Sequence, residues 1–99
     1  MSKWLQSGMR RDLCVLLYGD ERRGQQLKAD IEAGYEDRLH PDRFYGAMQK
    51  LVRAGFVEKR TEGLHDVYAL TDAGERSVEE HAAWVREEVA EAGEADSVE

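Results

Sequence analysis

The sequence lacks the features that would place a protein in a membrane or an oxidising compartment. Cys14 is its single cysteine, so no disulfide can form within the chain. No apolar run approaches the roughly 20 residues that a membrane span needs, and we recognise no signal peptide before the first expected helix. We therefore expect the 99 residues to form one soluble, cytoplasmic domain that does not associate with membranes.

Lysine is scarce and acidic residues are abundant. The 21 acidic residues outnumber the 14 basic ones, which leaves a net charge of −7, and arginine outnumbers lysine by 10 to 4. Such a composition suggests a proteome that works in concentrated salt, where charges are screened beyond about 3 Å at molar ionic strength. We therefore predict a halophilic protein, with an ordinary acidic protein as the alternative.

The sequence also lacks any constellation that points to catalysis or metal binding. It contains no phosphate-binding loop and no nucleophile–base motif. His40, His65 and His81 are far apart and have neither ligand spacing nor a cysteine partner. Cys14 lies in an apolar run, which is typical of a buried and inert thiol. We expect no metal, no cofactor and no enzymatic activity.

Residues 40–70 have the order of a helix, a glycine stop and a two-stranded hairpin. Pro41, the single proline, fits the first turn of a helix, where its missing N–H is not needed. Apolar residues then recur every three or four positions until Gly55 ends the helix. Two β-prone runs, 56–60 and 66–70, flank a turn at 61–65 in which Gly63 can take a positive φ. This order is typical of a winged helix-turn-helix.

Helices are expected on both sides of this unit. Apolar spacing predicts one helix over 4–18, ended by Gly19, and another over 24–35, with Gly34 as its left-handed cap. Thr71 is a good N-cap for the last helix. That helix carries an apolar seam spaced by four and three residues: Val78, Ala82, Val85, Val89 and Ala92.

These elements predict a mainly α fold with a small β-hairpin wing. Residues 1–70 would form a winged helix-turn-helix domain, and residues 71–92 a C-terminal dimerisation helix. Residues 93–99 are polar and acidic, so we expect a disordered acidic tail. Dimerisation would bury the apolar seam, which a lone C-terminal helix would leave exposed.

Basic residues concentrate in the same unit. Residues 38–65 contain 6 Lys or Arg against 3 acids, whereas residues 71–99 contain 2 against 10. Winged helices place the second helix of the helix-turn-helix in the major groove of double-stranded DNA. Arg43 and Gln49 are suited to base edges, and Lys50 and Arg53 to phosphates. On the wing, the candidates for minor-groove or backbone contact are Lys59, Arg60 and His65. A merely solvated polar face is the alternative.

Three motifs make the chain resemble the PadR family of transcriptional regulators. They are Tyr45-x-x-Met48-x-x-Leu51, Ala54-Gly55-Phe56-Val57, and Val67-Tyr68-Ala69-Leu70-Thr71-Asp72-Ala73-Gly74. The resemblance covers residues 13–89 and departs from the family at Asp42-Arg43, where Gly or Ser followed by Thr is common. The acidity is similar to that of haloarchaeal, phage-repressor-like members. The resemblance gives Tyr45 two alternative roles, reaching a phosphate or packing in the core.

The resemblance implies a sequence-specific DNA-binding repressor that acts as a homodimer on a pseudo-palindromic operator. First and last helices build the dimer interface in this family, which points to Val78, Ala82, Trp84, Val85 and Val89. Some members bind planar aromatic ligands there, so Trp4 and Trp84 either pack in the dimer or bind a small-molecule effector. Two other functions stay open: a winged-helix interaction module without DNA binding, and an aromatic-ligand-responsive sensor.

Overall fold

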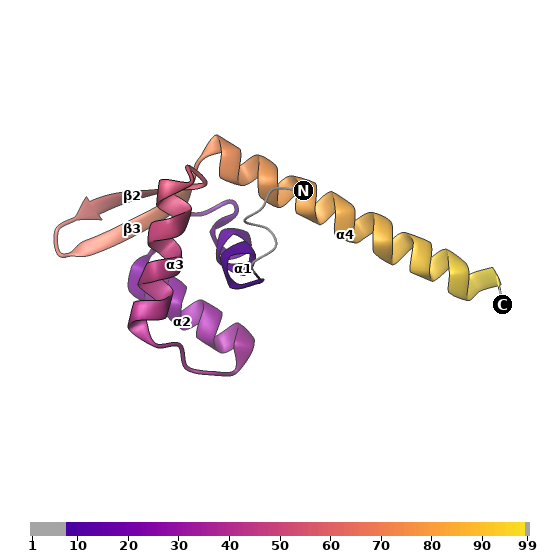
Figure 1. Ribbon diagram of the computed structural model, residues 1–99, viewed down its shortest axis with the longest axis horizontal. Helices are drawn as coiled ribbons and strands as arrows, with labels where there is room; N and C mark the ends of the chain where they lie inside the picture. Colours follow the sequence, from indigo (N-terminus) through magenta and orange to yellow (C-terminus); the bar gives the residue numbers. More distant parts are fainter. Residues whose placement is uncertain (1–7, 99) are drawn as a thin grey trace.

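The computed structural model describes the backbone of residues 8–98 and the side chains of residues 8–93. Three helices, α1 (Gly8–Leu17), α2 (Gly24–Tyr35) and α3 (Pro41–Arg53), pack together. A hairpin of β2 (Val57–Glu62) and β3 (His65–Leu70) extends from one side. The long helix α4 (Asp72–Val98) projects away on the side opposite the hairpin (Figure 1). This mainly helical architecture with a small sheet confirms the predicted fold class.

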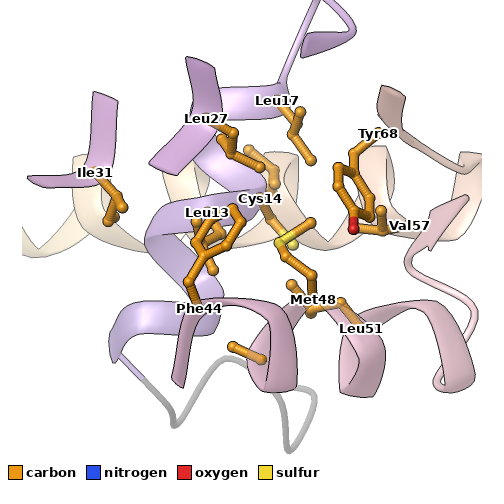
Figure 2. Close-up of a cluster of buried hydrophobic side chains, with 12 residues drawn as sticks. Leu13, Cys14, Leu17, Leu27, Ile31, Phe44, Met48, Leu51, Val57 and Tyr68 are labelled. Atoms are coloured by element: carbon orange, nitrogen blue, oxygen red, sulfur yellow. The ribbon is translucent and has the colours of Figure 1, made fainter. Parts of the chain in front are cut away.

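Buried side chains from every helix and from the hairpin form one core (Figure 2). Leu13, Cys14 and Leu17 of α1 lie at its centre, with Phe44 and Met48 packed from α3. Burial raises the pKa of the Cys14 thiol to about 12, so at neutral pH the group stays protonated and behaves as an apolar packing group. The expectation of a buried thiol is confirmed.

The ends of α2 and α3 lie where the local residues predict them, with one exception. Nδ1 of His40 accepts a hydrogen bond from the Asp42 N–H at 3.2 Å and caps α3, and Gly55 closes that helix with φ +83°. The left-handed cap of α2 is Glu36, with φ 55°, rather than the predicted Gly34, which lies inside the helix. A glycine near a helix end indicates that a left-handed cap lies close by, but it does not determine which residue forms that cap.

The turn between α2 and α3 is held by the side chain of Glu32. Its carboxylate accepts the Leu39 N–H at 2.7 Å and the Lys28 ammonium at 2.9 Å. These contacts lower the pKa of this carboxyl below its usual value. The hydrogen bond from Leu39 is the larger cause, and the contact with Lys28 is the next. This local contact explains why α2 can run past Gly34 and still turn sharply into α3.

The sheet has three strands in the order β1–β3–β2, all antiparallel. Residues 61 and 62 pair with Asp66 and His65, so the hairpin turn contains two residues, Gly63 and Leu64, and is shorter than the predicted 61–65. Gly63 has φ +60° at the first position of the turn, as a two-residue hairpin requires. The first strand, β1 (Arg22–Arg23), was not predicted, because two arginines carry no strand pattern.

The two ends of the hairpin meet at the start of α4. The Thr71 N–H donates to the carbonyl oxygen of Phe56 at 3.1 Å, and the Thr71 hydroxyl donates to the carbonyl oxygen of Gly55 at 2.5 Å. The same hydroxyl accepts the Gly74 N–H at 3.2 Å, which confirms Thr71 as the N-cap. A Cβ on Gly74 would lie 2.1 Å from the Phe56 carbonyl oxygen, so glycine is required there.

Two phenol–carboxylate hydrogen bonds connect α1, and Tyr18 directly after it, to α2 and α4. The Tyr18 hydroxyl donates to Glu79 of α4 at 2.7 Å, and the Tyr35 hydroxyl of α2 donates to Asp12 at 2.5 Å. Burial and the hydrogen bond to Asp12 raise the pKa of Tyr35 to about 12. The base of α4 is thereby fixed to the helical body.

The helix α4 leaves the body after its first turns. Ser77 and Val78 are buried, whereas the later side chains of Trp84, Val85 and Val89 are exposed. Backbone helix continues through Val98, so residues 93–98 differ from the predicted disordered tail. Among the described helices, α4 included, none is both long and apolar enough to cross a membrane.

The Gly74→Ala substitution should lower the free energy of unfolding by roughly 3 kcal/mol, because its methyl group would collide with backbone at Phe56. Urea unfolding followed by circular dichroism measures the change. Gly93→Ala is the matched control in the same helix, since a Cβ there meets nothing within 4 Å. Equal stability of the two variants would contradict the proposed steric role of Gly74.

Candidate nucleic-acid interface

The helix α3 presents a polar face opposite its buried stripe. Phe44, Met48 and Leu51 are buried in the core, and Pro41 starts the helix so that this stripe faces inward. The side chains on the other side are exposed: Asp42, Arg43, Gln49, Lys50 and Arg53. Asp42 lies in the first turn, where a carboxylate is favoured by the helix dipole.

A groove of about 560 Å³ runs between α3 and the hairpin. Tyr45, Gln49 and Arg53 line it from α3, and Lys59 lines it from β2. Four of the eight predicted DNA-binding residues therefore share one open surface. Two carboxylates, Asp42 and Asp66, also line this groove, which sequence reasoning had not brought together with the basic residues.

A second hollow, of about 500 Å³, lies on the other side of α3. Arg43 and Lys50, seven residues apart on α3, line it together with Arg10 from α1. Asp42 and Gly46 line both hollows, so they lie on the part of α3 that separates them. The predicted base contacts, Arg43 and Gln49, are thus placed on the two sides of one exposed helix surface.

The wing residues are divided between its two faces. Lys59 and Arg60 are adjacent in β2, so their side chains point to opposite faces of the hairpin. Arg60 bonds the carboxylates of Glu21 and Glu62, the latter at 2.7 Å, and these hydrogen bonds raise its pKa. His65 is exposed beside the turn, opposite Glu62. The structure therefore brings Lys59 into the groove but not Arg60 or His65.

Four basic side chains around α3 are available for an anionic partner. None of the ion pairs among the described side chains involves Arg43, Lys50, Arg53 or Lys59. In contrast, Arg22 of β1 pairs with Asp30, and Lys28 of α2 pairs with Glu32 at 2.9 Å. Four cations outside the ion pairs of the described side chains thus lie close together on α3 and the adjoining strand.

Tyr45 lies beside the buried Phe44 at the surface of α3. Its ring packs edge-to-face on Phe44, with centroids 4.8 Å apart, yet 40% of the residue is exposed. A Cβ on Gly24 would lie 3.2 Å from Tyr68 Cε2 and 3.6 Å from Tyr45 Cε1, so this glycine makes room for both rings. Tyr45 thus contacts one core residue, Phe44, and lines the groove.

The residues assigned to dimerisation fall into two groups. Val78 is 5% exposed and belongs to the core of the single chain, which corrects its assignment to an exposed seam. Ala82 is partly buried, and the apolar surface continues through Trp84, Val85 and Val89. Trp84 stacks on His81 with ring centroids 6.0 Å apart. Trp4, the other candidate for ligand binding, lies outside the described residues.

The described residues give no sign of a metal site. No three of their His, Cys, Asp or Glu side chains gather closely enough to hold an ion. The exposed polar surface of α3 and β2, with its hollows and basic side chains, is the candidate functional site, and its form fits a nucleic acid.

No family model and no curated protein matches the chain. Solved structures do match it. A complex of RosR, hsRosR-S1, is 24% identical with a TM-score of 0.80, and the match covers 99% of this chain and 100% of that one. RosR from H. salinarum, grown from NaBr, is also 24% identical, with a TM-score of 0.76 over 99% and 94% of the two chains.

Two bacterial structures share the same architecture over less of their length. PadR from Bacillus subtilis, in complex with operator DNA, is 22% identical with a TM-score of 0.63, covering 75% of this chain and 46% of PadR. ZitR from Lactococcus lactis is 13% identical with a TM-score of 0.74, covering 90% and 59%. The chain therefore has a winged helix-turn-helix fold. Within that class, its fold is similar to those of RosR and of PadR, and PadR belongs to the family whose motifs the sequence resembles.

Lys59 and Arg60 provide a test of the groove, because they are neighbours with the same charge on opposite faces of the wing. Lys59→Gln should weaken binding to duplex DNA and reduce the salt slope by about one, since an unpaired cation near a phosphate is lost. Arg60→Gln should change the slope by less, because Arg60 is already bound to two carboxylates. Fluorescence anisotropy at several KCl concentrations measures both; equal changes would contradict this placement.

Proposed function

We propose that the protein is a sequence-specific DNA-binding transcriptional regulator, and that α3 is its recognition helix. The observation that carries the proposal is the set of unpaired cations, Arg43, Lys50, Arg53 and Lys59, that surrounds the exposed face of α3. PadR, which has the same fold, is seen in complex with operator DNA. Nothing in this function needs a catalytic step or a cofactor.

Each exposed side chain of α3 has a chemistry that suits one part of a DNA duplex. Arg43 can donate two hydrogen bonds to guanine, and Gln49 can pair with the adenine edge in the major groove. Lys50, Arg53 and Lys59 suit phosphates, which position the protein without reading sequence. The Tyr45 hydroxyl makes no hydrogen bond with a described residue and is open to a phosphate from the groove.

The acidity of the chain is compatible with this function because charge is separated in space. Residues 71–99 hold 10 of the 21 acids, and α4 projects away from the wing and from α3 (Figure 1). The acidic helix would thus point away from bound DNA. We propose a halophilic protein that acts in the cytoplasm, where its DNA lies, and binding should accordingly be measured in molar as well as dilute KCl.

Selection of binding sites from random duplex DNA tests the function directly. The wild-type protein should select a defined sequence. Arg43→Ala should then weaken binding by about 1–3 kcal/mol and relax the preference at one base pair per half-site. Lys50→Ala should weaken binding to all sequences alike. If the wild-type protein selected no sequence at any salt concentration, the proposed function would be wrong.

A second function is favoured by one observation, the carboxylates of Asp42 and Asp66 within the groove. Together with the net charge of −7, they would suit a protein-interaction module that does not bind DNA. The same selection experiment separates the two functions. An aromatic-ligand-responsive sensor is a further alternative that uses Trp84, and quenching of tryptophan fluorescence by planar aromatic compounds would reveal such an effector.

We further propose that the regulator is a homodimer that acts as a repressor on a pseudo-palindromic operator. The exposed apolar surface of α4, at Trp84, Val85 and Val89, is the support for this arrangement. A twofold-symmetric dimer through α4 would present two copies of α3, and two such helices suit half-sites about one DNA turn apart. Repression is the sign of regulation that the family resemblance implies.

Val85→Asp should prevent dimerisation, at a cost of several kcal/mol, because it places an unpaired charge in the apolar seam. Light scattering at micromolar concentration gives the mass of the particle. Ala83→Asp is the matched control, since it adds the same charge about 200° around the helix from Val85. A monomeric wild-type protein at that concentration would rule out the dimer.

A further inference from the structure

Gly46 lies in the interior of α3, where glycine weakens a helix. Other glycines of the chain have a reason within the protein. Gly19, Gly55 and Gly63 take positive φ, and the backbone at Phe56 excludes a side chain from Gly74. A Cβ at Gly46 would meet nothing within 4 Å. The packing of this protein therefore does not require a glycine at position 46.

The position of Gly46 distinguishes it from Gly34 and Gly93, which are equally free of neighbours. Gly46 lines both hollows that flank α3. Residues three and four positions away share its face of the helix, and all four are exposed and polar: Asp42, Arg43, Gln49 and Lys50. The backbone of α3 is thus bare at the centre of the surface proposed to face DNA.

We infer that Gly46 is a specificity-determining position at which the major-groove edge of a base pair packs directly on the backbone of α3. This inference rests on the proposed function. A missing Cβ lets another molecule approach the backbone closely, and Gly46 borders both hollows beside α3. Because the helix can then lie deeper in the groove, the flanking Gln49 and Arg43 side chains come within reach of base edges.

Deep insertion of α3 into the major groove should matter for sequence-specific binding to DNA and not for non-specific binding. Contact with base edges needs the helix inside the major groove, whereas non-specific binding depends on phosphate contacts. Lys50, Arg53 and Lys59 would supply phosphate contacts from the flanks of α3 and from the wing. A methyl group at position 46 should therefore weaken the specific complex and spare the non-specific one.

The test compares Gly46→Ala with Gly34→Ala, a control change in the last turn of α2 whose methyl group also meets no neighbour. Both variants should raise Tm by about 2–8 °C, because alanine favours helix and neither methyl group meets a neighbour. Gly46→Ala should lower affinity for the DNA selected by the wild-type protein by about tenfold, comparable to one mismatched base pair. Its affinity for unrelated duplex DNA should stay within about twofold, and Gly34→Ala should leave both affinities unchanged.

The expected rise in Tm and the expected fall in affinity for the selected DNA have opposite signs, which separates a recognition role of Gly46 from a structural one. A Gly46→Ala variant that is more stable and binds the selected DNA less tightly supports the inference. A lowered Tm, or equal losses of specific and non-specific binding, would overturn it. If the variant kept the wild-type affinity for the selected DNA, this inference would fail while the proposed function stood; if the wild-type protein showed no sequence preference, both would fail.

Discussion

The contact between Thr71 and the Gly55–Phe56 segment determines how the rest of the molecule is arranged. Gly55 ends α3, Phe56 leads into β2, and Thr71 joins β3 to α4, so three junctions meet in one set of backbone contacts. An isolated two-stranded hairpin is only marginally stable in water. Here both of its ends are held beside the C-terminus of α3, and β1 pairs with its inner strand. The groove between α3 and the wing depends on this attachment.

The same attachment explains how a strongly acidic chain can present a basic surface. The direction of α4 is fixed where it leaves the hairpin, and that direction takes its glutamates away from α3 (Figure 1). Arg22 and Arg60 are held in ion pairs, whereas none of the ion pairs among the described side chains involves the cations around α3. The charge that a partner meets therefore depends on where the charged side chains lie and which of them form ion pairs. The net charge of the chain says little about it.

Local patterns in the sequence predicted most of the fold. The bounds of α2 and α3, the glycine stop at Gly55 and the cap at Thr71 follow from residues close to one another, and the structure confirms them. The strand β1 depends on a distant partner, β3, and has no pattern of its own. Glu36 became the cap of α2 because contacts made by Glu32 close the turn, which no single-residue preference indicates.

The candidate site was predictable to the extent that helix periodicity determines exposure. Periodicity placed Arg43, Gln49, Lys50 and Arg53 on the outside of α3, where the structure has them. Which wing cation faces the groove required the hairpin register, and the pairing of Arg60 with Glu21 joins segments far apart in sequence. Gly46 has no side chain whose chemistry could indicate a role in the sequence. The role inferred for it depends on the free space around it, which only the structure gives.

The phenol–carboxylate hydrogen bonds of Tyr18 and Tyr35 add contacts between helices that depend little on dissolved ions. Tyr18 and Tyr35 donate as neutral groups, so these connections owe little to long-range attraction between charges, which concentrated salt would screen. Their hydrogen bonds to carboxylates help to raise the pKa of both tyrosines, which means that the stabilisation is fully present below the ordinary phenol pKa near 10 and is lost as pH rises through the raised value. These two contacts between helices should therefore persist in concentrated salt and be lost at strongly alkaline pH.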